Sequence, residues 1–225
     1  MNDLSQHFPL SQRPSVNETA VSGDWRPIIG SSLSLVAELL SALPPEQWES
    51  PSLCTGWTVR DVAGHLIWML GSTRRQLASD VIRAALHSRQ NPGATVTALA
   101  QREARKDTAA LTATLEHLAA LRQEGSGRHG IGDLTEVVVH GYDIASALGL
   151  PLAFSPTATG AVAVARAARA PAVTRTLLRA RALSATDAGW SVGRGTPQAA
   201  PAAVLIPLLF GRNKNHSAQK LPSAQ

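Results

Sequence analysis

The sequence is poor in the residues and motifs on which several protein classes depend. It has a single cysteine, Cys54, in 225 residues, which excludes an intrachain disulfide framework and a zinc site built on a cysteine cluster. The glycine-rich P-loop, dinucleotide-binding and nucleophile-elbow motifs are also missing, which argues against those three chemistries. One cysteine suits a reducing compartment, so we expect a cytoplasmic protein.

Long hydrophobic runs are missing as well. The first two dozen residues are polar and contain no apolar stretch typical of a secretory signal. The apolar stretch 202–210 is too short to span a membrane, and Pro207 interrupts it. We therefore expect no membrane partner. Both ends are polar, and we expect flexible tails at 1–23 and 213–225.

Aromatic residues make up only 4% of the chain, and abundant alanine favours helices over a β-sandwich. A short strand is expected near 182–192, and a closing helix near 203–210. Four helices joined by short loops favour a mostly α fold, with an up-down four-helix bundle at 24–150 and a small α/β unit at 151–212. The spacing of apolar residues predicts helices over about 27–43, 58–87, 93–125, 131–148 and 156–182.

The predicted helix 131–148 carries the most informative pattern. Asp133, Glu136, His140 and Asp143 are spaced three, four and three residues apart, so they share one face between apolar flanks. Glu136 and His140 are one turn apart, where both can reach one ion. On this helix alone, the solvated polar face of an amphipathic helix is the favoured interpretation, because such stripes are routine on surface helices.

His65 changes the balance between these interpretations. It lies on the apolar face of the predicted helix 58–87, where a lone histidine is usually a hydrogen-bonded core residue. Together with Glu136 and His140, however, it completes a set of two histidines and one carboxylate from two helices of one bundle. Three protein ligands leave a coordination position open, as in catalytic metal sites.

The formal net charge of +5 raises the question of nucleic acid. The basic residues are scattered along the sequence, and their densest run, 166–181, has no interleaved aromatic residues to stack on bases. The sequence thus does not favour nucleic acid, and a positive field that steers an anionic small substrate explains the charge as well. Cys54 has no base that the sequence places beside it, so we interpret it as a spectator thiol.

Three segments together resemble a known family. They are Pro-Ser-Leu-Cys-Thr-Gly-Trp-Thr-Val-Arg-Asp-Val-Ala-Gly-His-Leu at 51–66, Asp-Leu-Thr-Glu-Val-Val-Val-His-Gly-Tyr-Asp-Ile-Ala at 133–145, and Ala-Thr-Asp-Ala-Gly-Trp-Ser-Val-Gly at 185–193 with Phe-Gly-Arg at 210–212. The chain resembles the mycothiol-dependent maleylpyruvate isomerase family, within the DinB-like four-helix-bundle metalloenzymes. The resemblance covers roughly 28–212, with a C-terminal unit that is abbreviated after the Gly-Arg pair.

The resemblance implies a fold, a metal and a cofactor. The fold would be a DinB-like bundle, and one divalent metal ion, usually zinc, would sit on His65, Glu136 and His140. Mycothiol would be the bound nucleophile for isomerisation or S-transfer on a small electrophilic substrate, and Asp143 would bind this cofactor. The alternative for Asp143 is an acid paired with a nearby arginine. Alternatives for the whole protein are a non-catalytic metal-binding bundle that acts as a sensor or partner-binding module, and a hydrolase in which the metal activates water.

Overall fold

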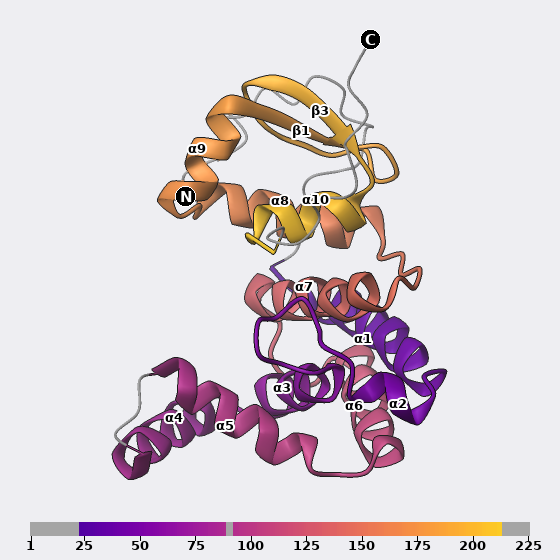
Figure 1. Ribbon diagram of the computed structural model, residues 1–225, viewed down its shortest axis with the longest axis vertical. Coiled ribbons are helices and arrows are strands. Elements are labelled where there is room, and N and C mark those ends of the chain that lie inside the picture. The colour runs from indigo at the N-terminus through magenta and orange to yellow at the C-terminus, as the bar shows by residue number, and fades with distance from the viewer. Residues whose placement is uncertain (1–22, 89–91, 213–225) are drawn as a thin grey trace.

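The computed structural model describes residues 23–88 and 92–212, which are mostly helical with one small sheet (Figure 1). The predicted tails fall outside these residues, except for Gly23. The elements in chain order are α1 (Arg26–Ser41), α2 (Pro45–Trp48), α3 (Val59–Gly71), α4 (Arg74–Ser88), α5 (Pro92–Ala104), α6 (Thr108–Gln123), α7 (Ile131–Leu148), α8 (Pro156–Ala168), α9 (Ala172–Ala180), β1 (Arg181–Ala185), β2 (Ser191–Gly193), β3 (Thr196–Ala200) and α10 (Ala202–Leu209).

Helices α1, α3, α6 and α7 form a four-helix bundle, which confirms the predicted fold class. Helices α1 and α3 each pack against both α6 and α7, so they lie diagonally across the bundle from one another. Local signals set two of the helix ends. A capping box between Thr58 and Asp61 begins α3, and Gly149, with φ of 66°, ends α7 in the left-handed conformation that glycine adopts without strain.

Two predicted helices are each broken in the structure. The helix predicted over 58–87 is interrupted at Ser72, whose backbone is extended, and a new helix begins after Thr73, whose side chain accepts a hydrogen bond from the Gln76 amide. The helix predicted over 93–125 is interrupted before Asp107, whose side chain accepts from the Ala110 amide at 2.8 Å. Apolar spacing continues through both breaks, so it does not reveal them. The resulting α4–α5 pair extends from one end of the bundle (Figure 1).

The C-terminal unit is a small mixed sheet with helices α8, α9 and α10, as predicted in outline. The helix predicted over 156–182 ends at Ala168 and restarts after Pro171, because proline cannot continue a helix from the preceding turn. The strand predicted over 182–192 is a hairpin: β1 pairs antiparallel with β2 and parallel with β3, in the order β2-β1-β3. The turn residues between the short apolar runs of β1 and β2 are the sequence signal that would have indicated this hairpin.

Helices α8 and α10 pack on α7, so the C-terminal unit lies against the bundle helix that carries the polar stripe (Figure 1). At Gly141 of α7, an added Cβ would lie 2.6 Å from the Phe154 ring, so glycine permits this close approach. The segment 149–155 links α7 to α8, and the division of the chain at residue 150 stays a prediction. Among the described helices, none has the length and apolar character needed to cross a bilayer.

Candidate metal centre

The site begins with the loop 51–57, which precedes α3. The Ser52 amide donates to the Trp57 carbonyl at 2.9 Å and the Trp57 amide donates to the Cys54 carbonyl at 3.0 Å, so the loop closes on itself. The Leu53 amide donates to the backbone carbonyl of Asp143 at 3.1 Å, which ties the loop to α7. This tie brings Cys54 and Trp57 over the polar stripe of that helix.

The structure brings together the three predicted ligands His65, Glu136 and His140. Glu136 Oε2 lies 3.1 Å from His65 Nε2 and 3.3 Å from His140 Nε2. Each residue offers one ligand atom within 4.8 Å of the others. Two tetrahedral ligands at the usual zinc distances are about 3.3 Å apart. The donor types and their separations therefore fit a divalent ion of this kind.

Burial and charge distinguish this group from a solvated stripe. His65 and His140 are 4% and 8% exposed. Burial by itself would raise the pKa of the Glu136 carboxyl, but hydrogen bonds with His140 and His65 outweigh it and hold that pKa far below its usual range. The Glu136 carboxylate is therefore negatively charged at neutral pH and lies beside two imidazole nitrogens. Its negative charge would favour the binding of a cation at this place.

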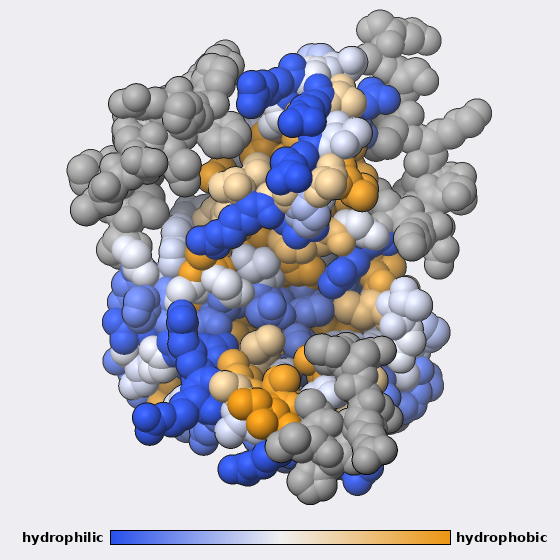
Figure 2. Space-filling model, turned by 90° about the vertical axis from the view of Figure 1, so that its left-hand side faces the viewer, coloured by the Kyte–Doolittle hydropathy of each residue, from blue (hydrophilic) through white to orange (hydrophobic). Residues whose placement is uncertain are grey.

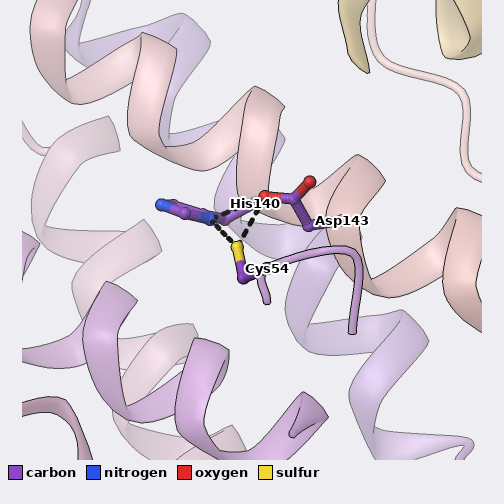
Figure 3. A group of neighbouring side chains, drawn as sticks. All are labelled: Cys54, His140 and Asp143. Atoms are coloured by element: carbon purple, nitrogen blue, oxygen red, sulfur yellow. Dashed lines mark hydrogen bonds and ion pairs between the residues drawn. The ribbon is translucent and has the colours of Figure 1, made fainter. Parts of the chain in front are cut away.

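A second group of contacts surrounds the other nitrogen of His140. His140 Nδ1 lies 3.0 Å from Asp143 Oδ2 and 3.5 Å from Cys54 Sγ, and the thiol is also 3.0 Å from Asp143 Oδ2 (Figure 3). Arg212, just after α10, donates from Nε to Asp143 Oδ1 at 3.1 Å and from Nη2 to Oδ2 at 3.2 Å. Asp143 is completely buried, and His140, Cys54 and Arg212 all contact its carboxylate.

These contacts shift the pKa values of both partners. Burial alone would raise the pKa of the Asp143 carboxyl, but the hydrogen bond with His140 and the positive charges of His140 and Arg212 lower it. Burial alone would lower the pKa of the His140 imidazole, but hydrogen bonds with Asp143, Cys54 and Glu136 raise it well above its usual range. Without a metal ion, a proton on His140 thus sits between two carboxylates.

The ligand group opens into a cavity of about 760 Å³, enough for a small-molecule ligand. It is lined by the loop 51–57, the three predicted ligands, Gly211 and Arg212. The Trp57 ring lies 5.1 Å from His65 and is stacked 6.4 Å from His140, measured between ring centroids. Its Nε1 donates to Thr97 Oγ1 of α5 at 3.1 Å, so the wall over both imidazoles is anchored from outside the bundle.

Cys54, His140 and Asp143 form a second group with metal-ligand atoms. The Arg212 guanidinium already contacts Asp143 and lies 3.8 Å from Cys54 Sγ. Its positive charge opposes a second cation at this place, whereas neither arginine nor lysine is a member of the first group. In the described part of the chain, no fourth His, Cys, Asp or Glu side chain joins the first group within 4.8 Å.

The sequence predicted the group of His65, Glu136 and His140, which the structure brings together, and their role as metal ligands stays a prediction. The side chains that surround this group were not predicted. Cys54 was interpreted as a spectator because no base could be assigned to it, and the tertiary fold places His140 and Asp143 beside it. The sequence indicated no role for Arg212 beyond its place in the Phe-Gly-Arg motif, although Arg212 contacts Asp143 and lines the cavity. Asp143 accepts from an arginine, as one alternative expected, and binding of the cofactor by Asp143 stays a prediction.

Fold and site together define a helix-bundle protein with two buried histidines and one half-buried carboxylate at a cavity. Residues 31–145, just over half of the chain, match the family model described as the mycothiol maleylpyruvate isomerase N-terminal domain. The chain therefore belongs to the mycothiol maleylpyruvate isomerase family, as its motifs predicted.

Two solved structures are similar to this chain. One is a mycothiol-dependent maleylpyruvate isomerase, with 13% sequence identity, a TM-score of 0.48, and coverage of 97% of this chain and 98% of the other. The other is a histidine-to-alanine mutant of a mycothiol-dependent maleylpyruvate isomerase, with 14% identity, a TM-score of 0.46 and the same coverage. No curated protein sequence matches the chain.

Proposed function

We propose that this protein is a cytoplasmic, thiol-dependent metalloenzyme that uses mycothiol as nucleophile for isomerisation or S-transfer on a small electrophilic substrate. The observation that carries the proposal is the convergence of His65, Glu136 and His140 at the wall of a cavity. The lack of a fourth donor from the described residues supports an open position, which a structural metal site would not keep. This favours an enzyme over a non-catalytic metal-binding module.

The family resemblance implies zinc as the metal. A divalent cation held by these three side chains would lower the pKa of a bound thiol, and the thiolate could then add reversibly to an electron-poor double bond or displace a leaving group. The chain itself supplies orientation. Asp143 accepts a hydrogen bond from His140 Nδ1, which leaves the Nε2 lone pair directed toward Glu136 and His65. Trp57 covers both imidazole rings and restricts the access of water.

Arg212 completes the site from the C-terminal unit. Its side chain is 28% exposed, lines the cavity, and holds Asp143 through paired hydrogen bonds. We propose that it positions Asp143 and supplies positive charge to an anionic substrate at the cavity mouth. The residues of both parts of the chain are then needed for one reaction.

Metal content tests the first half of the proposal. We expect about one divalent ion per chain by elemental analysis, and its loss in His65→Ala and His140→Ala, because two remaining ligands hold zinc weakly. His117→Ala is the matched control, since His117 is exposed on α6. Native protein without divalent metal, or equal metal content in all variants, would contradict the proposed centre.

Dependence on a thiol tests the second half. With maleylpyruvate as test substrate, turnover should require added mycothiol or a close analogue, and mass spectrometry should detect a thiol adduct if the reaction is S-transfer. Full activity in thiol-free buffer would instead indicate that the metal activates water. Metal content without activity on any electrophile tried would favour the non-catalytic module.

A further inference from the structure

Basic residues are scattered along the whole sequence, and the sequence pattern alone does not favour nucleic acid, but the net positive charge is concentrated in the C-terminal unit. Residues 151–212 contain seven arginines, no lysine and one acidic residue, Asp187, whereas the bundle residues 24–150 contain more acidic than basic side chains. The net charge of the whole chain, +5, therefore originates in less than a third of its length. Two of the seven arginines are engaged elsewhere: Arg166 donates to the Leu209 carbonyl and Arg212 to Asp143.

The other five arginines are all exposed, and we call this set of residues the arginine face. Arg175 and Arg179 are four residues apart on α9, so they lie one above the other on its outer side. The tight turn 193–195 returns to this helix, where the Arg194 amide donates to the Leu178 carbonyl at 2.9 Å. Arg194 therefore lies beside the end of α9, next to Arg181. The members of the arginine face are Arg169, Arg175, Arg179, Arg181 and Arg194.

Charge on the arginine face is not compensated by nearby carboxylates. Within residues 23–88 and 92–212, none of its five members forms an ion pair. Asp187 accepts from the Ala202 amide and follows the far end of β1, which lies about 13 Å along the strand from Arg181. Figure 2 views the side of the molecule on which α9 lies. Several strongly hydrophilic side chains, in blue, are seen in the upper half of this view.

We propose that the arginine face binds the phosphate backbone of a nucleic-acid duplex, independently of base sequence. Guanidinium groups present paired donors that match phosphate oxygens. Helix α9 spans about 14 Å, a length over which a duplex carries about eight phosphates. Arg175 and Arg179 lie along this length and Arg181 and Arg194 lie at its end, so these four can each reach a different phosphate.

The chemistry of the face discriminates against other polyanions. Protein interfaces depend on large apolar or aromatic anchors, and the exposed apolar group on α9 is Val173, a small side chain. Insertion into a membrane surface needs large apolar residues on the outer side, but Leu177 and Leu178 of α9 are directed into the body of the unit. Single strands require aromatic stacking, which no residue of the face provides. Duplex binding needs only the charge.

The salt dependence of binding is the sharpest test. A fluorescein-labelled 30-base-pair DNA duplex of random sequence serves as probe for the full-length chain, with binding followed by anisotropy. If all five arginines contact phosphates, affinity should fall about 500-fold between 50 and 200 mM salt. A second duplex of unrelated sequence should bind within about threefold of the first, because backbone contacts carry no sequence information.

Charge reversal then locates the surface. Arg175→Glu/Arg179→Glu should weaken binding at least about tenfold and make the slope of log affinity against log salt shallower by about two. Arg74→Glu/Arg75→Glu changes the net charge equally at exposed positions of α4 and should leave the slope unchanged. Arg175→Gln/Arg179→Gln gives the same direction with less risk to folding, which circular dichroism monitors.

Three results would overturn the proposal. Absence of duplex binding at 50 mM salt would show that the face takes no nucleic acid. Equal losses in the α9 and α4 variants would show attraction by total charge alone. Tighter binding to phosphatidylserine vesicles or to poly-glutamate than to the duplex would assign the face to a membrane or to an acidic protein.

Discussion

Asp143 offers the most informative single substitution, because it connects His140, Cys54 and Arg212 while lying completely out of solvent. Asp143→Asn preserves the shape of the side chain but removes its charge. An amide can donate as well as accept, so it no longer keeps the proton on His140 Nδ1. Loss of such a partner usually reduces metal affinity by about 10- to 100-fold.

The same substitution leaves Arg212 without its counter-ion. Breaking a buried pair costs about 3–5 kcal/mol, but Arg212 is 28% exposed, and solvent reduces the loss to about 2–4 kcal/mol. For a chain of this size the melting temperature should fall by roughly 5–15 °C. Thermal unfolding by circular dichroism measures this loss, and competition with a fluorescent zinc chelator measures the metal affinity.

Asp133→Asn is the matched control for this experiment. Asp133 is also on α7 and pairs with Arg128 at 2.6 Å, but its partner lies outside the ligand group. The control should lose stability and keep its metal affinity. If Asp143→Asn keeps wild-type metal affinity and raises only the KM for the thiol, the positioning role is refuted and the predicted contact between Asp143 and the cofactor is supported.

Three further predictions concern the thiol, the titrating groups and the packing of α7. Cys54→Ser should keep metal content and thiol-dependent activity within about threefold, since a hydroxyl can make the same hydrogen bond; loss of activity at full metal content would make the protein's own sulfur a reactant. In metal-free protein the raised pKa of His140 adds stability that is complete below its usual 6.5 and is lost at higher pH. The lowered pKa of Glu136 adds stability that is present above its usual 4.5 and is lost at lower pH, so melting temperatures of the chelated protein should peak between these values, and a peak above pH 7 would contradict the shifts. Gly141→Ala should cost about 1–3 kcal/mol in urea unfolding because its Cβ meets the Phe154 ring at 2.6 Å, and an unchanged midpoint would contradict the close packing of α7.

The periodic part of the molecule was readable from the sequence. Apolar spacing identified the bundle helices, and the capping box at Thr58 and the glycine at 149 marked two helix ends correctly. Both signals are local, because they depend on residues within a turn of one another. The breaks at Ser72 and Asp107 were not predicted, because each half of the interrupted pattern remains amphipathic. Strands β2 and β3 were not predicted as separate strands, because short strands contain too few residues to show a clear alternation of apolar and polar side chains.

The candidate site likewise has a part that the sequence predicted and a part that only the tertiary structure shows. Glu136 and His140 lie one helical turn apart, so their spacing alone predicted a shared face, and the apolar neighbours of His65 predicted its inward direction. Only the tertiary structure brought Cys54 and Arg212 to Asp143, across 89 and 69 residues of sequence. Contacts at such separations depend on loop closure and on the docking of the C-terminal unit against α7, and no local pattern encodes them. The sequence by itself thus determined which side chains could hold a metal ion, whereas packing decided which residues orient them and form the cavity.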